Sequence, residues 1–390
     1  MRSRARIIVT GLIAQYPLGG MTWHYLQYAI GLMRMGHDVY YLEDTGAWPY
    51  NPDRDALTDD CTYNASYLAD VLERFGLGDR WAYRCPRDQV WWGMKDSARR
   101  SVLATADLII NVSGMLRNLE EYRNTTRLAF IDTDPVFTQL KLLRGQEDFR
   151  ALVDAHDVTF SFGECLPGTL PATGHTWLPT RQPVVLEEWE HDLPHRSAFT
   201  TIMNWTSYKP VTFNGSTYGQ KDVEFRGLMD LPDLVGPTVL EIAINAGKTK
   251  RTPEDLLRYS GWRVVDPNRV CPDLDSYRRY IQTSKAEWSV GKNGYVAGRS
   301  GWFSERSACY LAAGRPVVVQ NTGFDVCIPV GRGVLAFTDP QEAAEAIREI
   351  EGDYKAHSDA AKLIARSYFD SDRVLTQLVE QSFGEVPSHG

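Results

Sequence analysis

Two carboxylates separated by a single residue, Asp132 and Asp134, follow the apolar run at 128–131. At this spacing both side chains can reach one divalent cation, because carboxylate oxygens are the ligands that hard cations prefer. Either carboxylate could instead accept a proton from a hydroxyl group as a general base. A strand-end turn closed by the aspartates and Pro135 is the purely structural alternative. The residues by themselves leave all three interpretations open.

A glycine pair, Gly19 and Gly20, lies between an apolar run at 7–12 and a helical pattern at 21–35, with His24 in the first turns of that helix. Glycines let the backbone approach a ligand closely, and a helix N-terminus favours anions. The pattern therefore predicts a phosphate-binding turn, and the alternative is a tight turn without a ligand. His24 is a candidate catalytic side chain if it faces a ligand, and otherwise a helix-surface histidine.

Tryptophans and tyrosines are frequent in the first half of the chain. Their flat rings suit a sugar or an aromatic ligand, although core packing explains most such residues equally well. The candidates for ligand contact are Trp23, Trp48, Trp91 and Trp92.

The composition is that of a globular protein, with 43% hydrophobic and 24% charged residues among 390. The formal net charge of −8 disfavours nucleic acid as a partner. No apolar stretch approaches the roughly 18 residues of a membrane-spanning helix. Arg2, Arg4 and Arg6 precede an apolar run at 7–14 as in a signal peptide, but the run is short and includes Gly11, so we expect a first buried strand.

Six cysteines are widely spaced and form no CxxC pair, which argues against a disulfide scaffold or a zinc ribbon. We expect free thiols in a reducing cytosol, and hence a cytoplasmic protein. The residues concerned are Cys61, Cys85, Cys165, Cys271, Cys309 and Cys327.

Strand and helix patterns alternate twice along the chain. Apolar strands are predicted at 7–12, 38–42, 107–112, 128–131 and 158–162, and again at 199–203, 238–244, 262–265, 287–290 and 316–319. A proline-rich, acidic stretch at 179–198 separates the two series and reads as a connection between domains. Alternation of this kind predicts an α/β protein with two Rossmann-like domains facing a cleft.

The element Gly19-Gly20…His24, followed by Gly36-His37-Asp38-Val39, is similar to the GGxxxH and GHxV elements of the large bacterial retaining family of GT-B glycosyltransferases. This resemblance implies an acceptor-binding domain over residues 1–195, a nucleotide-sugar-binding domain over 196–365, and a C-terminal helix over 366–390 that crosses back to the first domain.

The start of the second half is also similar to that family. The resemblance assigns Lys221 to the basic pair that neutralises the donor diphosphate. The family's arginine after the preceding strand is missing, because residues 204–207 stand there, and Lys209 is the candidate substitute.

The stretch 298–319 resembles the family's nucleotide-sugar element, which runs into an AxGxPVV strand. The family's two glutamates fall on Gly301 and Cys309, so the donor contacts must be rearranged. Arg306 could clamp a phosphate and Glu305 could accept bonds from ribose or sugar hydroxyls. Capping of a helix by serine and glutamate is the alternative. The candidates here are Ser304, Glu305, Arg306 and Ser307.

Two more segments complete the resemblance. The loop 320–324 with Gly323, then Gly331-Arg332-Gly333 and Asp339-Pro340, follows the family's order and spacing, and Val270 lies where a loop offers backbone groups to the nucleotide base.

The resemblance implies transfer of a sugar from a UDP-, dTDP- or GDP-sugar to a hydroxyl of a small-molecule acceptor. We expect no metal and no other cofactor, with the leaving diphosphate stabilised by cations and helix N-termini. Asp132 or Asp134 would then serve as the base for an acceptor hydroxyl if the reaction inverts. A sugar-nucleotide epimerase and a nucleotide-sugar-binding protein that has lost catalysis are the alternatives.

Overall fold

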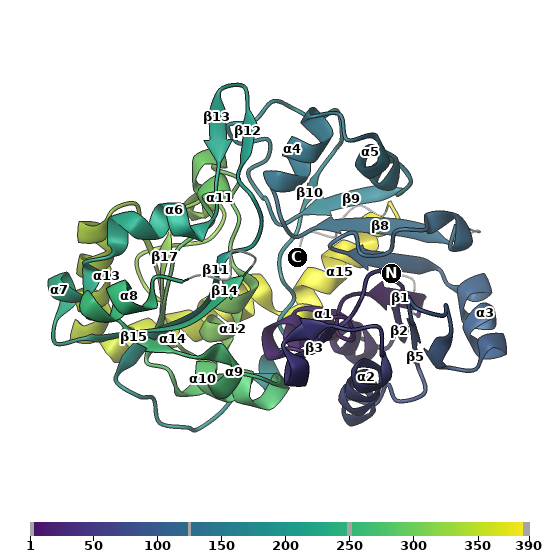
Figure 1. Cartoon of the computed structure of the whole chain (residues 1–390), viewed down its shortest axis with the longest axis horizontal. Helices are drawn as coiled ribbons and strands as arrows, with labels where there is room; N and C mark the ends of the chain where they lie inside the picture. Colours follow the sequence, from purple (N-terminus) through teal and green to yellow (C-terminus); the bar gives the residue numbers. More distant parts are fainter. Residues whose placement is uncertain (1–3, 124–125, 248–251, 385–390) are drawn as a thin grey trace.

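The computed structural model describes residues 4–123, 126–247 and 252–384, which form two parallel sheets lying side by side (Figure 1). Helices cover the faces of both sheets. This arrangement confirms the predicted α/β class with two Rossmann-like halves. The predicted domain limits at 1 and 390 lie outside the described residues.

The first sheet has eight strands among the described residues, in the order β10-β9-β8-β7-β1-β2-β5-β6, and β6 alone runs antiparallel to its neighbour. Its central strand is apolar on both faces, with Ile7, Ile8 and Val9 at most 1% exposed, as expected where helices cover a parallel sheet. The strands are β1 (Arg6–Thr10), β2 (Asp38–Glu43), β5 (Trp81–Arg84), β6 (Trp91–Gly93), β7 (Leu108–Val112), β8 (Arg127–Asp132), β9 (Val158–Ser161) and β10 (Leu178–Pro179).

The helices of this half are α1 (Gly19–Arg34), α2 (Thr62–Arg74), α3 (Asp96–Thr105), α4 (Phe137–Leu143) and α5 (Glu147–Asp154). Smaller elements are the hairpin β3 (Tyr50–Asn51) and β4 (Ala56–Leu57) and the 3₁₀ turns η1 (Pro52–Arg54) and η2 (Leu119–Glu121).

In the described residues, the second sheet has six strands, all parallel, in the order β15-β14-β11-β16-β17-β18. Its strands are β11 (Ala198–Thr206), β14 (Val239–Gly247), β15 (Arg263–Val265), β16 (Ala286–Ser289), β17 (Val317–Gln320) and β18 (Val334–Phe337). Its helices are α6 (Lys221–Phe225), α7 (Leu231–Val235), α8 (Glu254–Tyr259), α9 (Pro267–Val270), α10 (Leu274–Thr283), α11 (Asn293–Gly298), α12 (Glu305–Ala312) and α13 (Pro340–Gly352). The second half also contains a hairpin of β12 (Val211–Phe213) and β13 (Ser216–Tyr218) and the turns η4 (Arg226–Leu228) and η5 (Phe324–Val326). The turn η3 (Leu186–Glu188) lies in the connection between the two sheets.

The strand order reverses between β1 and β7 in the first sheet and between β11 and β16 in the second. Ligands of open α/β sheets bind beyond the carboxyl ends of the strands at such reversal points. The two reversal points therefore define where a site must be sought.

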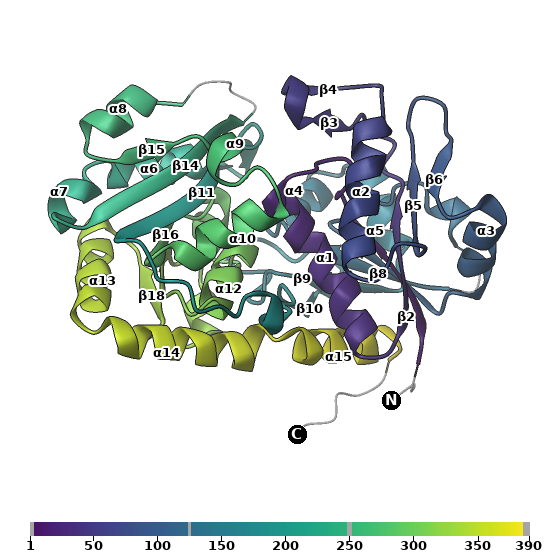
Figure 2. The same ribbon diagram turned by 90° about the horizontal axis from the view of Figure 1, so that it is seen from below.

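Three helical segments at the C-terminus return the chain to the first half, as predicted. The helix α14 (Tyr354–Ile364) continues through the π-helical turn η6 (Ala365–Phe369) into α15 (Ser371–Ser382), and Figure 2 shows them running along one side of both halves. A Cβ atom at Gly31 of α1 would lie 2.6 Å from a methyl carbon of Leu375, so the two helices pack closely.

The two halves also share buried contacts near α1. The indole nitrogen of Trp23 donates to the carbonyl of Leu274 at 2.9 Å, and the rings of Trp23 and Trp189 lie 5.1 Å apart. The amide oxygen of Gln27 accepts bonds from the Val185 backbone and the Trp189 indole. The halves are therefore joined by a packed core as well as by the chain.

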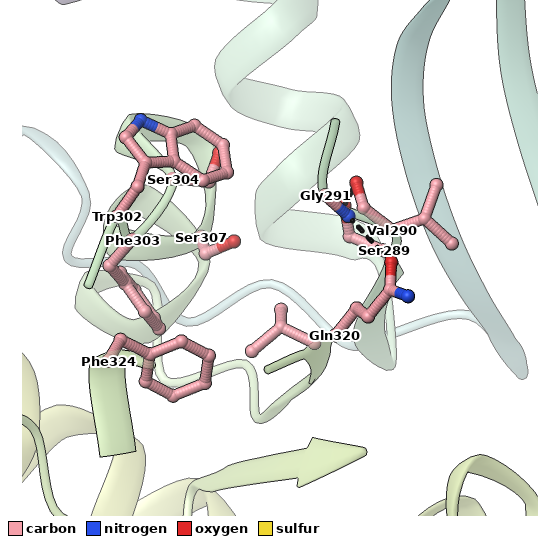
Figure 3. Close-up of a pocket in the computed structure, with 10 residues that line it drawn as sticks. Ser289, Val290, Gly291, Trp302, Phe303, Ser304, Ser307, Gln320 and Phe324 are labelled. Atoms are coloured by element: carbon pink, nitrogen blue, oxygen red, sulfur yellow. Dashed lines mark hydrogen bonds between the residues drawn. The ribbon is translucent and has the colours of Figure 1, made fainter. Parts of the chain in front are cut away.

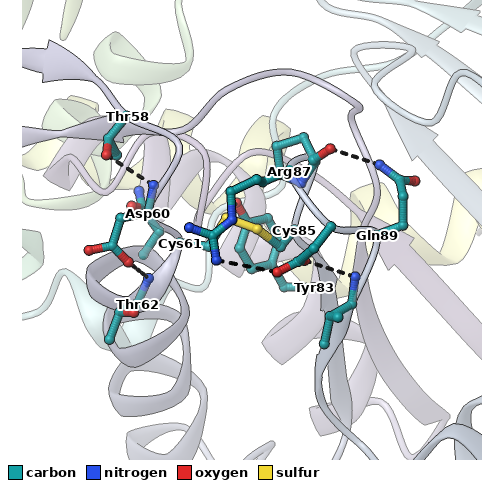
Figure 4. The surroundings of a disulfide bond; sticks show 12 residues. Thr58, Asp60, Cys61, Thr62, Tyr83, Cys85, Arg87 and Gln89 are labelled. Atoms are coloured by element: carbon teal, nitrogen blue, oxygen red, sulfur yellow. Dashed lines mark hydrogen bonds and ion pairs between the residues drawn. A yellow bond between two sulfur atoms is a disulfide. The ribbon is translucent and has the colours of Figure 1, made fainter.

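The expectation of six free thiols is wrong for Cys61 and Cys85, which form a disulfide (Figure 4). Cys61 precedes α2 and Cys85 follows β5, so the bond ties that helix to the β5–β6 hairpin. The pair could not be predicted from spacing, because the two cysteines lie 24 positions apart and only the fold brings them together. The other four cysteines are free thiols, as expected.

Candidate functional site

A small pocket lies at the carboxyl ends of β16 and β17, next to the reversal point of the second sheet (Figure 3). The segment after β16, the start of α12 and the end of β17 enclose it, and the Gly291 amide donates to the Gln320 side chain at 3.2 Å. The pocket therefore sits where the topology predicts a ligand. Its lining includes Ser289, Val290, Gly291, Trp302, Phe303, Ser304, Ser307 and Gln320.

The N-terminus of α12 opens toward this pocket without a side-chain cap. Ser304 occupies the capping position, but its hydroxyl makes no capping hydrogen bond. The hydroxyl of Ser307 is fully buried and has no partner among the described residues. A helix start with unsatisfied amides and a free hydroxyl beside it is chemically suited to an anion.

Lys221, the first residue of α6, lies beside the start of α12. Burial and the neighbouring Arg306 charge lower the pKa of its ammonium group to about 7, and the Glu305 and Glu287 carboxylates oppose this shift. Its ammonium makes no hydrogen bond or ion pair with any residue that the structure describes. A half-buried ammonium without a partner is costly, and a bound anion would relieve that cost.

Arg306 does not have the free guanidinium that a phosphate clamp requires. Its nitrogens donate to Glu287 at 2.6 Å, to the Ile202 carbonyl at 2.5 Å and to Ser289 at 2.6 Å. Although burial alone would lower the pKa of Arg306, the Glu287 carboxylate raises it above its ordinary value. Arg306 therefore braces β11 and β16 beneath the site, and its charge acts on the site only at a distance.

Glu305 and His24 approach each other from the two halves. Burial lowers the pKa of His24 on α1, and the Glu305 carboxylate opposes that shift. The Nδ1 atom of His24 is buried without a partner, and Glu305 makes no hydrogen bond or salt bridge with any described residue. The fold thus brings these two side chains and Lys221 together, and none of the three forms an ion pair with a described residue.

Asp132, in contrast, accepts hydrogen bonds only from residues of its own half. Its carboxylate accepts bonds from the Asp134 amide and from Thr138, Gln139 and Ser161, at 2.7–3.1 Å. Burial raises its pKa, and these donors oppose the shift. The side chain is 1% exposed and organises the turn after β8, which matches the structural alternative for this pair.

Asp134 joins the two halves. Lys292 donates to its carboxylate at 2.8 Å and Tyr208 at 2.6 Å, and Tyr295 donates as well. Burial would raise the pKa of Asp134, but the Lys292 charge and these donors hold it below the ordinary value. A carboxylate with three donors and a low pKa is a weak base, so its placement favours a structural contact over proton transfer.

The two glycines predicted to approach a phosphate instead approach α10. A Cβ atom at Gly19 would lie 2.3 Å from the Asp273 carbonyl oxygen, and one at Gly20 would lie 3.1 Å from the Tyr277 ring. Close packing between the two halves therefore accounts for both glycines.

The remaining predicted donor residues are spread around the second sheet. Lys209 is exposed in the segment between β11 and β12, and Val270 ends α9 after β15. Gly323 has φ +94° beside the pocket residue Phe324. Of the three, only Gly323 adjoins the pocket.

The four tryptophans do not form one surface. Trp23 is 1% exposed in the core between the halves. Trp48 is 45% exposed in the loop before β3. Trp91 and Trp92 lie on β6, the edge strand farthest along the sheet from β7, and the Arg99 guanidinium lies 4.2 Å from the Trp91 ring centre.

A line of hydroxyl groups lies at the reversal point of the first sheet. Tyr25 donates to Ser113 at 3.2 Å, and the Ser113 and Thr133 hydroxyls are 2.7 Å apart. Ser113 follows β7 directly and has φ +61°, an uncommon conformation for a residue with a side chain. Ser113 and Thr133 were not predicted as site residues, although Ser113 directly follows the strand predicted at 107–112 and Thr133 lies two positions after the strand predicted at 128–131.

No group of three or more metal-ligating side chains occurs in the described part of the chain. None of the described helices is long and apolar enough to span a membrane.

No protein-family model matches the sequence, and no curated protein is significantly similar to it. Solved structures with the same arrangement are numerous. HepE of Anabaena, solved with UDP and glucose, has a TM-score of 0.59 at 12% identity, covering 98% of this chain and 100% of its own. Sucrose-phosphate synthase of Thermosynechococcus elongatus has a TM-score of 0.57 at 12% identity, with the same coverage. An alpha-glucosyltransferase with UDP-glucose and DNA has a TM-score of 0.57 at 11% identity over 97% of this chain and 99% of its own.

These similarities extend over both sheets and the returning helix, so they concern the whole architecture rather than one nucleotide-binding half. The chain thus has the two-sheet GT-B fold of these glycosyltransferases.

Proposed function

We propose that this protein transfers a glycosyl group from a nucleoside-diphosphate sugar to a hydroxyl of a small-molecule acceptor, without a metal ion. The observation that carries the proposal is the partnerless ammonium of Lys221 beside the uncapped N-terminus of α12. Together they offer positive charge at the reversal point of the second sheet, where a diphosphate would sit.

The chemical task in this proposal is to stabilise the diphosphate as it leaves the sugar. Lys221 supplies an ammonium group, the first turn of α12 supplies backbone amides, and Ser307 supplies a hydroxyl. Donors fixed before the reaction stabilise developing charge without reorganising, and they act more strongly where water is excluded. The ion pair between Arg306 and Glu287 fixes the position of α12 against β16.

The acceptor side of the proposal rests on the first sheet. The hydroxyls of Tyr25, Ser113 and Thr133 can donate to or accept from an acceptor hydroxyl. Asp132 and Asp134 are left out of the proton transfer, because Asp132 is buried with four donors and Lys292 holds the pKa of Asp134 below its ordinary value. Glu305 and His24 are the titratable side chains that remain between the donor and acceptor sides.

Uridine diphosphate is the first nucleotide to test, because several structures with this fold were solved with UDP or UDP-glucose. The test is a thermal-shift series with UDP, dTDP and GDP and their glucose conjugates, with and without EDTA. A ligand that binds only the folded protein raises its melting temperature. We expect one nucleotide to shift the wild type equally with and without EDTA, and Lys221→Met to lose most of the shift.

Lys209→Met is the matched control, because it removes an exposed lysine from the same half. It should retain the full shift. No shift with any of the six compounds would reject the proposed donor site, and a shift abolished by EDTA would reject the metal-free mechanism. A shift without slow release of free nucleotide from the sugar conjugate would instead support the binding protein that has lost catalysis.

A further inference from the structure

Two of the free cysteines meet across the boundary between the two halves. Cys165 lies in the loop after β9 of the first sheet, and Cys327 lies directly after η5 of the second half. Their sulfur atoms are 3.6 Å apart although 162 residues separate them in the chain. No other pair of free thiols in the described part of the chain has a sulfur contact.

Their surroundings differ from those of the other two thiols. Cys165 and Cys327 are half-buried, whereas Cys271 and Cys309 are buried. The thiol of Cys309 lies 3.8 Å from the Gln27 amide nitrogen inside the core between the halves. Small reagents can therefore reach the Cys165–Cys327 pair more readily than the buried thiols.

The loop that carries Cys165 is already bound to the second half through its backbone. The Cys165 amide donates to the Ser300 carbonyl at 2.9 Å, and the Thr169 amide donates to the Gly298 carbonyl at 3.0 Å. A Cβ atom at Gly301 would lie 2.7 Å from the Cys165 sulfur. The two segments are thus held in contact, which favours a cross-link between them.

We propose that Cys165 and Cys327 form a reversible disulfide that locks the two halves of the protein together next to the pocket at β16 and β17. Closing the sulfur separation from 3.6 Å to the bonded length of about 2.05 Å requires only a small adjustment of the side chains. The bond would join the loop after β9 to the segment that carries Gly323 and Phe324, so the halves could not separate there.

Formation of the bond requires an oxidant, and a low-molecular-weight disulfide such as oxidised glutathione supplies it. The thiolate of one of the two cysteines attacks one sulfur of that disulfide, forming a mixed disulfide and releasing one glutathione thiolate. The other cysteine loses its proton, attacks the protein sulfur of the mixed disulfide and releases the second glutathione. Two protein thiols are oxidised to one disulfide, and one glutathione disulfide is reduced to two thiols.

Burial raises the pKa of the Cys327 thiol to about 12, so this thiol is mostly protonated near neutral pH. Because the thiolate is the nucleophile in exchange, Cys327 must lose its proton before it can attack a disulfide sulfur.

The full-length protein can be tested by incubation in buffers of defined reduced-to-oxidised glutathione ratio, followed by alkylation and peptide mass spectrometry without reduction. Chymotrypsin is suitable because it cleaves after Tyr310 and Phe324, which separates Cys309 from Cys327. We expect oxidising buffer to lower the free thiols from four to two per chain and to yield a cross-linked peptide pair that contains Cys165 and Cys327. Reduced buffer should restore both thiols.

The variants Cys165→Ser and Cys327→Ser should each lose the cross-linked pair, and Cys165 in the second variant should retain a glutathione adduct. Cys271→Ala, the matched control, should retain the cross-link. Separate glutathione adducts on both wild-type thiols, without a cross-link, would overturn the proposal. Hydrogen exchange tests the lock itself, and we expect the amides of residues 163–169 to exchange more slowly in the oxidised wild type. Equal exchange in both redox states would contradict the lock.

Discussion

The charged side chains at the carboxyl ends of the two sheets differ in whether they have hydrogen-bond or ion-pair partners. At the end of the first sheet, the Asp132 carboxylate accepts four hydrogen bonds, and the Asp134 carboxylate is paired with Lys292 and accepts bonds from two tyrosine hydroxyls. At the end of the second sheet, the Ser307 hydroxyl is buried without a partner, and Lys221 forms no ion pair with a described residue. The first set stabilises the fold, whereas the second set is left free to bind the proposed ligand. The charges of these residues did not distinguish the two sets in the sequence.

The same contrast holds within the second sheet. Arg306 and Lys221 are neighbouring cations, but Arg306 is paired with the buried Glu287 at 2.6 Å and Lys221 is not paired. Removing one partner of a buried ion pair destabilises the fold, whereas an unpaired, partly buried cation opposes folding until an anion binds. Substitutions at these two positions should therefore separate stability from ligand binding.

Replacement of Arg306 should have the largest effect on stability. Arg306→Met leaves the Glu287 carboxylate, which is 0% exposed, without its counter-charge. Breaking a buried ion pair from one side costs roughly 3–5 kcal/mol in the free energy of unfolding. Urea denaturation should show this loss, and the double variant Arg306→Met with Glu287→Gln should recover part of it. If Arg306→Met has normal stability but no longer binds nucleotide, Arg306 is a phosphate-binding residue after all, and the contrast drawn with Lys221 is wrong.

Replacement of Asp134 should have the next largest effect. Asp134→Asn removes the charge that Lys292 and two tyrosines contact across the halves, and we expect a loss of about 1–3 kcal/mol because the pair is partly exposed. The folded-state pKa of Asp134 lies below its unfolded value, so its contribution is present above about pH 4 and disappears as pH falls through the folded pKa. The difference in unfolding free energy between wild type and variant should therefore shrink in acid.

Activity measurements distinguish this structural role from catalysis. A general base typically contributes about 10²–10⁴-fold to rate, so a fall of that size in kcat for Asp134→Asn at unchanged stability would make Asp134 the base. Thr138→Val is the matched control for the neighbouring turn, because it removes one donor to Asp132 and leaves Asp134 intact.

Nucleotide affinity should depend moderately on pH, and this dependence tests whether the Lys221 ammonium binds the nucleotide. Its pKa of about 7 means that the free protein loses this charge as pH rises from 6 to 8. Anion affinity should fall over that interval, by up to about tenfold if the charge is worth 1.4 kcal/mol to binding. Calorimetric titration with UDP would measure this fall. Lys221→Met should bind weakly at both pH values, and an equal fall in that variant would assign the titration to another group.

Much of the fold could be predicted from the sequence, because the apolar strands and the helical spacing around them are local patterns. The runs at 7–12 and 316–319 became β1 and β17, and the pattern at 21–35 became α1. The hairpins β5–β6 and β12–β13 were missed, because their strands are short and mostly lack an apolar run. Helix α12 was also predicted from its local pattern, whereas Lys221 was selected only through the resemblance to a family motif.

The site was harder to predict because its contacts join distant segments. Gly19 and Gly20 suggested a phosphate turn, but the partner that requires them, α10, lies about 250 residues away. Asp134 meets Tyr208, Lys292 and Tyr295 only in the folded protein. Short-range spacing shows that a charge exists, and only tertiary structure shows whether another residue already neutralises it.

The smallest expected effect concerns the aromatic residues of the first half. Trp92 is 39% exposed on the edge strand β6, away from the reversal point between β1 and β7. Trp92→Ala should change the free energy of unfolding by about 1 kcal/mol or less and should leave the KM for the acceptor unchanged. Trp91→Ala, the control on the same strand, should cost more stability because the Arg99 guanidinium packs on its ring. A rise in acceptor KM of tenfold or more for Trp92→Ala alone would extend the acceptor site to this edge, so that both ends of the first sheet would contribute to function rather than its reversal point alone.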